Sequence, residues 1–272
     1  MTFIHPTAII GEGAVIGDDC NIGAYAVIGP KVVLGRNNRI GPHVVIEGRT
    51  ILGNDNLIFQ FASIGAAPQD LKYKGEDSQL IIGNSNIIRE YVTLQPGTAG
   101  GGMLTSIGDG NLFMANCHAG HDTCIGSFNV FANSAALAGH VSVGSWVTVG
   151  GMCGVHQFVR LGDVCLLGAG SMVTKDVPPY CIAQGDRAGL AGLNVIGLKR
   201  RGLGSDEIAN LKKVYREIFG GTGSFSLRLE GARKLAGSSE AAVSMLDFIA
   251  LTKRGITQPR SKHKTGAEQV LE

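Results

Sequence analysis

The sequence lacks several features that would place the protein in a membrane or in an oxidising compartment. It has no stretch of about 18 consecutive apolar residues, which excludes a membrane-spanning helix. No basic segment followed by a long apolar run stands at its start, so no signal peptide is predicted. The six cysteines form no CxxC pair, which is typical of small buried thiols in a reducing compartment. These absences predict a cytoplasmic protein without stable membrane insertion.

Neither sign of charge dominates the whole chain, whose formal net charge is +2, but the two ends differ. Residues 187–272 carry 15 Lys/Arg against 8 Asp/Glu, whereas residues 1–186 carry 9 against 14. A basic end on an acidic remainder favours a docking surface for an acidic partner. A solvated basic helical face without any partner explains the charge equally well.

An apolar residue recurs at every sixth position over most of the chain, usually followed by Gly. A helix would repeat every 3.6 residues and a strand every two, so this period belongs to neither alone. Hexapeptide repeats are the signature of a parallel β-helix, in which three short strands and their turns close a triangular coil of about 18 residues. The repeating positions are Ile4, Ile10, Ile16, Ile22, Ile28, Leu34, Ile40, Ile46, Leu52, Ile58 and Ile64, then Ile82, Ile88 and Leu94, and then every sixth residue from Ile107 to Val173.

The sixth-position side chains are expected to point inward and to stack on those of neighbouring coils. The Gly that follows them suits a corner, where positive φ or a close backbone approach excludes a Cβ. Disorder is the alternative for a chain with 41 glycines, but 44% hydrophobic residues in an unbroken register oppose it. The prediction is an all-β parallel β-helix over residues 1–186, for which the general crossover rule would give a right-handed coil.

Two interruptions of the repeat predict inserted loops at about residues 66–81 and 95–106. A coil can extrude a loop at a corner without disturbing its neighbours, so such loops are natural places for function. A tolerated surface insertion is the simpler alternative.

A small α-helical domain is predicted for residues 187–255, and a disordered tail for residues 256–272. The domain follows Pro178 and Pro179, which end regular strand pairing. Its first long helix is expected to be capped by Ser205 and to stop at Gly220, and further helical patterns cover residues 224–236 and 239–254.

Histidines cluster in the second run of repeats, and at about 18 residues per coil His121 and His140 should lie one coil apart. Asp122 could orient the imidazole of His121, and Gly120 and Gly139 could offer backbone N–H groups to an oxyanion. Such a cluster indicates acid–base chemistry or a metal site, although any one of these histidines taken alone would more often be structural. The clustered residues are His118, His121, His140 and His156.

Seven segments resemble the motifs of the UDP-N-acetylglucosamine acyltransferases, in the same order and spacing over about residues 3–255. The segments are QDLKY (69–73), NCHAGHD (116–122), LAGHVSVG (137–144), GGMCGVHQF (150–158), DVPPY (176–180), AQG (183–185) and GLNVIGLKRRG (192–202). The resemblance implies a homotrimer of left-handed β-helices with active sites between subunits. It also implies transfer of a 3-hydroxyacyl group from acyl carrier protein to the sugar 3-OH, the first step of lipid A biosynthesis.

The resemblance assigns a role to individual residues. His121 would be the general base, Asp122 would hold its imidazole, and the backbone N–H of Gly139 would meet the oxyanion. No cofactor, metal or covalent intermediate is implied, because the acyl group arrives on the phosphopantetheine of the carrier protein. The resemblance implies no nucleic acid partner either. The sugar would contact Asp70, Lys72, His118 and His140, the nucleotide and diphosphate would contact His156, Gln157, Asn194, Arg200 and Arg201, and the carrier protein would dock on Lys199, Lys212, Lys213 and Arg216.

Two positions limit the resemblance. Ile196 stands where some members have an acidic residue that contacts the nucleotide. Ala169 stands at the family's stop for the acyl chain, and its methyl group predicts a pocket of intermediate to long reach. The sequence leaves open the acyl chain length, a 3-OH or 3-amino acceptor, the order of binding and any regulation.

Competing functions are compatible with the same repeat. A related N-acyltransferase would be expected to carry an additional N-terminal domain, and QDLKY and GLNVIGLKRRG argue against a coenzyme A-dependent acetyltransferase. A γ-type carbonic anhydrase would hold zinc with three histidines, a count that His118, His121 and His140 could match. A purely structural β-helix would not need this group of polar residues.

Overall fold

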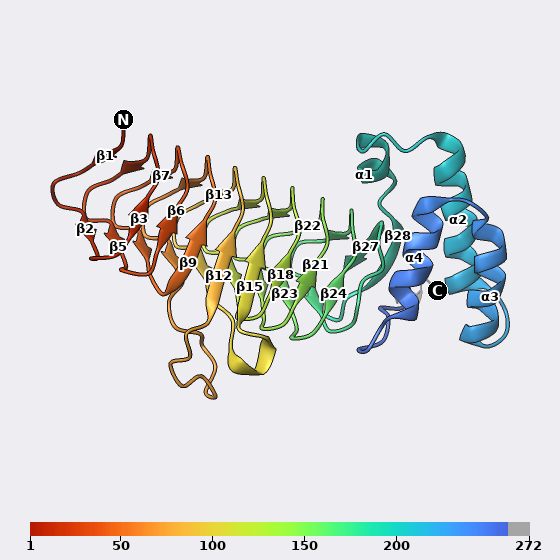
Figure 1. The fold of residues 1–272 in the computed structure, drawn as a ribbon. Helices are drawn as coiled ribbons and strands as arrows, with labels where there is room; N and C mark the ends of the chain where they lie inside the picture. The colour runs from red at the N-terminus through yellow and green to blue at the C-terminus, as the bar shows by residue number, and fades with distance from the viewer. Residues whose placement is uncertain (261–272) are drawn as a thin grey trace, which may run out of the picture.

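The computed structural model describes residues 1–260 and shows a three-sided rod with a group of helices at its C-terminal end (Figure 1). Each side of the rod is a parallel sheet, whose neighbouring strands come from successive coils. In an uninterrupted stretch register partners are 18 residues apart, as for Asn21 and Arg39. The predicted parallel β-helix of hexapeptide repeats is therefore confirmed.

Most strands contain only two residues, because the other residues of each hexad form the corner. The first sheet contains β1 (Phe3–Ile4), β4 (Asn21–Ile22), β7 (Arg39–Ile40), β10 (Leu57–Ile58), β13 (Ile87–Ile88), β16 (Leu112–Phe113), β19 (Val130–Phe131), β22 (Thr148–Val149), β25 (Leu166–Leu167), β27 (Cys181–Gln184) and β28 (Gly189–Leu193). The second contains β2 (Ile9–Ile10), β5 (Val27–Ile28), β8 (Val45–Ile46), β11 (Ser63–Ile64), β14 (Thr93–Leu94), β17 (His118–Ala119), β20 (Ala136–Leu137), β23 (Gly154–Val155) and β26 (Met172–Val173). The third contains β3 (Val15–Ile16), β6 (Val33–Leu34), β9 (Arg49–Leu52), β12 (Gln79–Ile82), β15 (Leu104–Ile107), β18 (Cys124–Ile125), β21 (Ser142–Val143) and β24 (Arg160–Leu161).

The core has two inward positions in each hexad. The sixth-position residues are buried as predicted from Ile22 onward, whereas Ile4 in the first coil is 40% exposed because no coil precedes it. The residue two places earlier also points inward, and it varies from Ala26 and Asn38 to Val32 and Leu80. On the first sheet this second position forms a ladder of buried asparagines, in which the side-chain nitrogen of Asn56 donates to Oδ1 of Asn38 at 3.0 Å. Asn86 and Asn111 continue the ladder.

Most corners turn through a residue with positive φ, and most of these residues are not glycine. At the corner after β4, for example, Tyr25 has a φ of 57° while Gly23 does not adopt positive φ. A Cβ on Gly23 would lie 2.8 Å from the backbone of Gly41 in the next coil. The glycine after the sixth-position residue thus serves the close approach of coils, one of the two alternatives that the sequence allowed.

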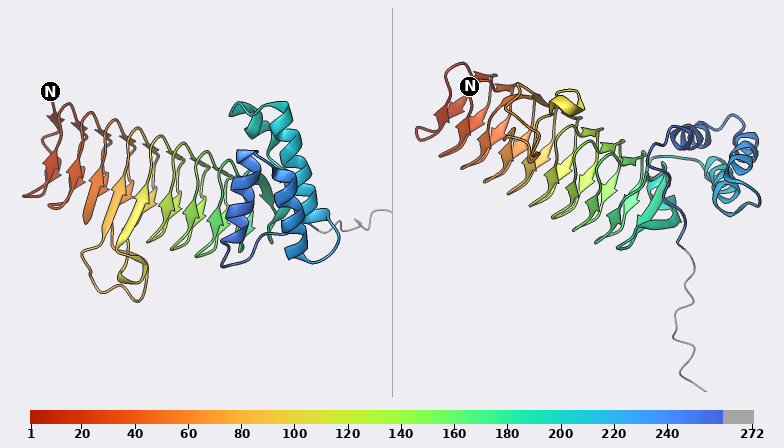
Figure 2. Two further views of the ribbon diagram at one scale, coloured as in Figure 1. Left: turned by 45° about the vertical axis from the view of Figure 1, so that its right-hand side comes forward. Right: turned by 90° about the horizontal axis from the view of Figure 1, so that it is seen from below.

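We name the corners by the sheets they join: the first edge joins the first and second sheets, the second edge joins the second and third, and the third edge joins the third and first. Both inserted loops leave the rod at the second edge and lie side by side (Figures 1 and 2). Strand pairing resumes at Gln79 and Leu104, slightly before the predicted loop ends. The second loop contains the short helix η1 (Ala99–Gly101).

Within the described residues, four helices follow β28: α1 (Val195–Arg200), α2 (Ser205–Gly220), α3 (Phe225–Ala236) and α4 (Glu240–Ala250). Gly204, not Ser205, is the N-cap of α2, and α4 ends four residues before the predicted limit of 254. Residues 256–260, assigned by sequence to the tail, bridge back to the rod through Ile256 and Pro259. The rest of that predicted tail, residues 261–272, lies outside the described residues. Within residues 1–260 no helix is long and apolar enough to cross a membrane.

Candidate active site

A buried carboxylate lies at the second edge, immediately after β17. Asp122 occupies the positive-φ position of its corner with a φ of 58°, and its side chain is only 1% exposed. An isolated carboxylate buried to this extent would be costly, so its hydrogen-bond partners define the site. The inserted second loop and the neighbouring coil supply them.

Thr98, in the second loop, holds Asp122 in place. The backbone N–H of Thr98 donates to Oδ1 of Asp122 at 2.8 Å, and its hydroxyl donates to Oδ2 at 2.6 Å. Gly101 packs so closely that a Cβ there would collide with the same carboxylate. Sequence reasoning marked this loop as a place for function but missed Thr98, because nothing in its composition distinguishes it from other loop residues.

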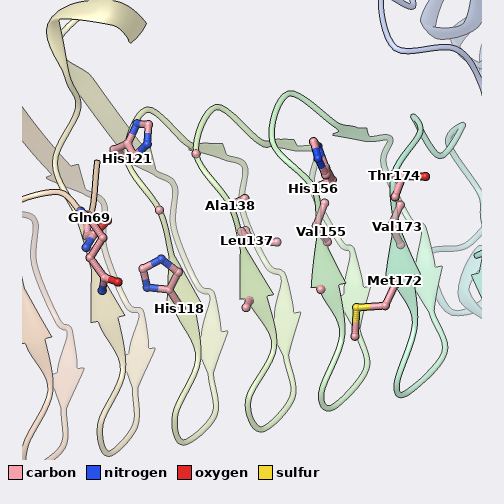
Figure 3. A pocket seen from close by; sticks show the side chains of 15 residues that line it. Gln69, His118, His121, Leu137, Ala138, Val155, His156, Met172, Val173 and Thr174 are labelled. Carbon is pink, nitrogen blue, oxygen red and sulfur yellow. Dashed lines mark hydrogen bonds between the residues drawn. The ribbon is translucent and has the colours of Figure 1, made fainter. Parts of the chain in front are cut away.

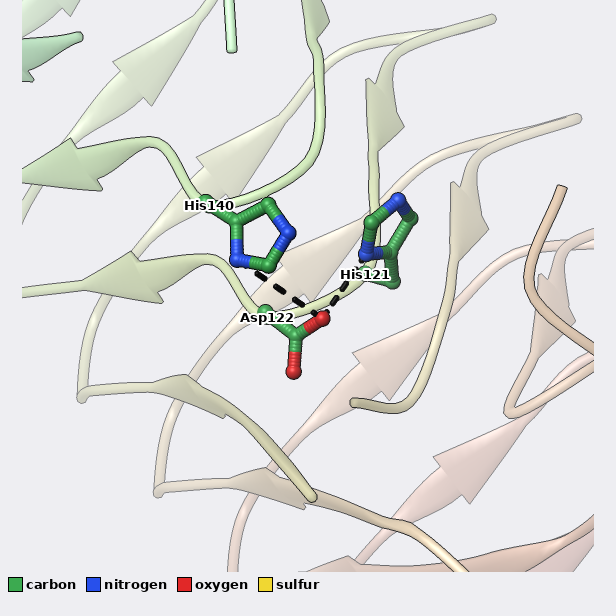
Figure 4. Close-up of side chains that lie close together, drawn as sticks. All are labelled: His121, Asp122 and His140. Atoms are coloured by element: carbon green, nitrogen blue, oxygen red, sulfur yellow. Dashed lines mark hydrogen bonds and ion pairs between the residues drawn. The ribbon is translucent and has the colours of Figure 1, made fainter. Parts of the chain in front are cut away.

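His121 is oriented by Asp122 (Figure 4), and its other ring nitrogen points toward Gly139. Nδ1 of His121 lies 2.8 Å from Oδ2 of Asp122. An ionised carboxylate only accepts hydrogen bonds, so Nδ1 carries the proton and Nε2 is left as the basic atom. A Cβ on Gly139 would lie 2.5 Å from Nε2, so only glycine leaves room for this ring. The arrangement places a base beside a buried main-chain segment.

The N–H of Gly139 is available to a ligand. In the described part of the chain it donates to no backbone carbonyl, although Ala138 and His140 on either side both do. An unpaired, buried N–H beside a basic nitrogen can stabilise negative charge that develops on a reacting oxygen.

Two further imidazoles surround His121, and both stay neutral more readily than a free histidine. Burial lowers the pKa of His118, with a smaller effect from His121, and Nδ1 of His118 lies 2.7 Å from the hydroxyl of Thr93. Burial also lowers the pKa of His140, while nearby Asp122 acts in the opposite direction. The ring of His140 lies edge-on to that of His121, with centroids 5.0 Å apart, as expected for residues one coil apart.

A groove of about 510 Å³ runs from these histidines along the second sheet toward the helices (Figure 3). Its polar end contains His118 and His121, and Gly139 and His156 line it further along. His156 is exposed, and its Nδ1 lies 3.1 Å from the carbonyl oxygen of Gln157.

A second cavity of about 680 Å³ joins the first inserted loop to the same edge. Asp70 and Lys72 from that loop line it together with Thr98 and His140. The structure therefore brings together the loop residues and the histidine that the resemblance assigned to one ligand.

Of the residues expected to bind the nucleotide and diphosphate, His156 lines the groove beside His121, whereas three others lie elsewhere on this chain. Asn194, Arg200 and Arg201 line a cavity of about 700 Å³ outside the first sheet. Asn194 caps α1, accepting from Gly197 N at 3.0 Å, and the guanidinium carbon of Arg201 lies 3.7 Å from the ring centroid of Trp146. Sequence reasoning missed Trp146, because only the fold brings its corner against α1.

The remaining predicted residues lie on the surface of the protein. Ile196 and Ala169 are exposed, and Ala169 lies at the first edge between β25 and β26, outside the lining of the groove. The predicted docking residues are exposed on α1 and α2; they are Lys199, Lys212, Lys213 and Arg216.

A metal could find three ligands here, since donor atoms of His121, Asp122 and His140 lie within 4.8 Å of one another. Both oxygens of Asp122, however, already accept hydrogen bonds from Thr98. The set also differs from the three histidines that a carbonic anhydrase would use, because His118 is not a member.

The repeats and the C-terminal helices both match family models of transferases. Family models described as bacterial transferase hexapeptide match residues 1–30 and 13–48, and one described as the hexapeptide repeat of succinyl-transferase matches residues 140–175. A model described as UDP N-acetylglucosamine O-acyltransferase, domain 2, matches residues 176–257. The rod and its helices thus define a hexapeptide-repeat transferase.

Relatives that match over nearly their whole length show which family of hexapeptide-repeat transferases the chain resembles. The acyl-[acyl-carrier-protein]–UDP-N-acetylglucosamine O-acyltransferase of Aliarcobacter butzleri is 51% identical over 94% of this chain and 98% of its own length. The enzyme of that name from Myxococcus xanthus is 49% identical over 95% and 100%. The solved UDP-N-acetylglucosamine acyltransferase of Francisella novicida superposes with a TM-score of 0.92 at 37% identity, covering 95% of both chains. The chain belongs to the family of acyl-[acyl-carrier-protein]–UDP-N-acetylglucosamine O-acyltransferases, and its rod is a left-handed β-helix.

Proposed function

We propose that the protein transfers a 3-hydroxyacyl group from acyl carrier protein to the 3-OH of UDP-N-acetylglucosamine, the first step of lipid A biosynthesis. Family membership supports the substrates. The observation that carries the chemistry is the series Thr98–Asp122–His121, which leaves Nε2 of His121 beside the free N–H of Gly139.

The reaction needs only a base and an oxyanion donor. Nε2 of His121 takes the proton from the sugar 3-OH while that oxygen attacks the thioester carbonyl. The N–H of Gly139 donates to the oxyanion that forms on the carbonyl oxygen. The C–S bond then breaks, and the imidazolium returns the proton to the departing sulfur. Neither a cofactor, a metal nor a covalent enzyme intermediate takes part in this proposal.

The substrates would occupy the cavities already described. Asp70, Lys72, His118 and His140 would contact the glucosamine, since all four line the two cavities beside His121. The diphosphate would pair with Arg200 and Arg201, whose forked donors match phosphate oxygens, and the nucleotide with His156, Gln157 and Asn194. The acidic carrier protein would dock on the exposed cations of α1 and α2.

We propose a homotrimer because the catalytic residues and the residues proposed to bind the diphosphate lie on different sides of one chain. His121 lies at the second edge, whereas Arg201 lines a cavity outside the first sheet. Packing of one rod against the next would bring these two groups of residues together. Light scattering should therefore give three times the chain mass, and a monomer would contradict the arrangement. The cytoplasmic location stays a prediction.

A transfer assay read by mass spectrometry tests the function. Purified protein would receive UDP-N-acetylglucosamine and a mixture of 3-hydroxyacyl carrier proteins, in parallel with a His121→Ala variant. We expect a mono-acylated sugar nucleotide from the wild type and a rate lower by about 10³-fold in the variant, within the range for loss of a general base. Equal rates would remove His121 as the base. No product from either protein would contradict this acceptor and direct the assay to a 3-amino sugar, and then to measurement of bound zinc.

A further inference from the structure

The third edge of the rod changes in character along its length. Its first five positive-φ positions hold small or polar residues, which are Asp19, Asn37, Asp55, Ser85 and Gly110. In the next two coils Phe128 and Trp146 hold the same position, with φ of 61° and 62°. Their rings stack with centroids 4.2 Å apart and planes inclined by 14°. A pair of partly exposed aromatic rings therefore lies at this edge, beside the cavity that α1 helps to line.

Arg201, the C-cap of α1, covers one face of this pair. Its guanidinium carbon lies 3.7 Å from the ring centroid of Trp146. Phe128 occupies the other face of the indole, because two groups this close to one centroid cannot share a face. On its far side Phe128 rests on the preceding corner, where a Cβ on Gly110 would lie 2.7 Å from the ring. The two rings and the guanidinium thus form one continuous stack on the rod.

A second contact attaches the other end of α1 to the same edge. Asn194, the N-cap, accepts from the N–H of Gly197 at 3.0 Å, and its Nδ2 donates to the carbonyl oxygen of Val164 at 2.9 Å. Val164 holds the third-edge corner one coil beyond Trp146. The short helix is therefore fixed to the rod at both ends, and Arg201 is held beside the indole.

Arg201 differs from the other arginines that lie over aromatic rings. Within residues 1–260 these are Arg89 over Phe59, Arg160 over Phe248 and Arg228 over Phe225. Each of the three also has an acceptor in the chain, namely the carboxylates of Glu90 and Asp176 and the carbonyl oxygen of Ile218. The guanidinium of Arg201 has no acceptor among the described residues, although it lines a cavity of about 700 Å³. A held cation with unused N–H donors suits an anionic ligand.

We propose that Trp146 is a positioning residue that holds the guanidinium of Arg201 for the diphosphate of the sugar nucleotide. The inference rests on the proposed function, which assigns the diphosphate to Arg200 and Arg201. Both contacts of Arg201 are compatible, because the indole takes the face of the guanidinium and phosphate oxygens accept from the N–H groups in its plane. Stacking in advance also lowers the entropy that a long side chain loses when it binds a ligand.

Steady-state kinetics of Trp146 variants test the proposal. We expect Trp146→Ala to raise the KM for UDP-N-acetylglucosamine about 3- to 20-fold, the range for loss of a cation–π contact, while kcat and the KM for the carrier protein stay within about twofold. Trp146→Phe should restore most of the affinity, since it keeps a ring, whereas Trp146→Leu should not. Tyr91→Ala is the matched control, because Tyr91 is a stacked, exposed corner ring of the first edge and does not line this cavity. Tm and light scattering would show that each variant keeps the fold and assembly of the wild type.

The indole also reports on its own site, because Trp146 is the one tryptophan of the chain. Titration with UDP-N-acetylglucosamine should change its emission saturably, since a phosphate on the guanidinium alters the charge beside the ring. We expect Arg201→Ala to raise the half-saturating concentration about tenfold or more, the value of a hydrogen bond to a charged group. Arg200→Ala should raise it less, because Arg200 lies over no aromatic ring in the described part of the chain. Uridine, which lacks phosphate, should leave the emission unchanged.

The outcomes separate this inference from the function on which it rests. A wild-type KM for the sugar nucleotide in a folded, active Trp146→Ala variant would overturn the role of Trp146 and leave the transferase standing. A fall in kcat with KM unchanged would also overturn it, and so would an emission change with uridine alone, which would place the base on the indole. A wild type that forms no acylated sugar nucleotide would contradict the proposed function, whereas an emission change that depends on Arg201 would still support the diphosphate site.

Discussion

The first and second edges of the rod use the same repeat position for different purposes. At the first edge, Tyr25, His43, Phe61 and Tyr91 form an exposed stack with ring centroids 5.0 to 5.3 Å apart. At the second edge, the equivalent positions are held by Asp122, His140 and Phe158, and the rings of the last two stack at 4.4 Å. Stacking follows in both cases from the spacing of the coils, which is about 4.8 Å.

The difference between the edges comes from the inserted loops. Residues of the first edge are open to solvent, whereas Thr98 and Gly101 of the second loop cover Asp122. Burial gives this carboxylate fixed partners and leaves His121 in one orientation. The repeat therefore provides a regular support for side chains, and an excursion from the repeat turns one edge into a site.

The sharpest way to break this comparison is to remove one histidine from each edge. His43 and His140 share positive φ, at 56° and 61°, and each stacks against an aromatic ring. We expect His140→Ala to lower kcat/KM by about 10- to 100-fold, the value of one hydrogen bond at a charged or polar site. His43→Ala should retain wild-type kinetics. Comparable losses in both variants, with Tm unchanged, would show that the site does not depend on the second edge.

A smaller effect is expected when the loop contact itself is weakened. Thr98→Val removes the hydroxyl that donates to Asp122 but keeps the shape and the backbone N–H, so kcat should fall about five- to tenfold. Thr105→Val is the matched control, because the buried hydroxyl of Thr105 has no hydrogen-bond partner among the described residues. Steady-state kinetics of both variants would measure the difference. A Thr98→Val enzyme with wild-type kcat would show that Asp122 is adequately held without the hydroxyl.

The fold could be predicted from the sequence because one position in every six specifies it. A buried aliphatic such as Ile22 or Leu34 recurs every six residues, and this repeat is the signature of a parallel β-helix. The second inward position escaped notice because polar and apolar residues alternate irregularly at it. Asn38 and Cys20 both occupy it, so it shows no apolar period.

The site could be predicted only where it follows the repeat. His121 and His140 are 19 residues apart, which places them one coil apart on the same edge. Thr98 lies in a loop without a period, so its contact with Asp122 depends on how that loop folds back. The contact of Arg201 with Trp146 likewise requires α1 to pack beside the third edge. Neither relation is encoded in sequence spacing.

The smallest expected effect concerns pH, and it sharpens the contrast between buried and exposed imidazoles. Burial lowers the pKa of His118 below its ordinary value of 6.5, so the folded protein binds fewer protons there than the unfolded chain. Stability should therefore fall as pH drops from about 6.5 through the lowered pKa, and the loss should persist below it. Between about pH 7.5 and 5.5, Tm of the wild type should fall a few degrees more than that of His118→Gln. His43→Gln, on the exposed edge, should follow the wild type. An equal fall of Tm in all three proteins would show that protonation of His118 does not destabilise the folded state.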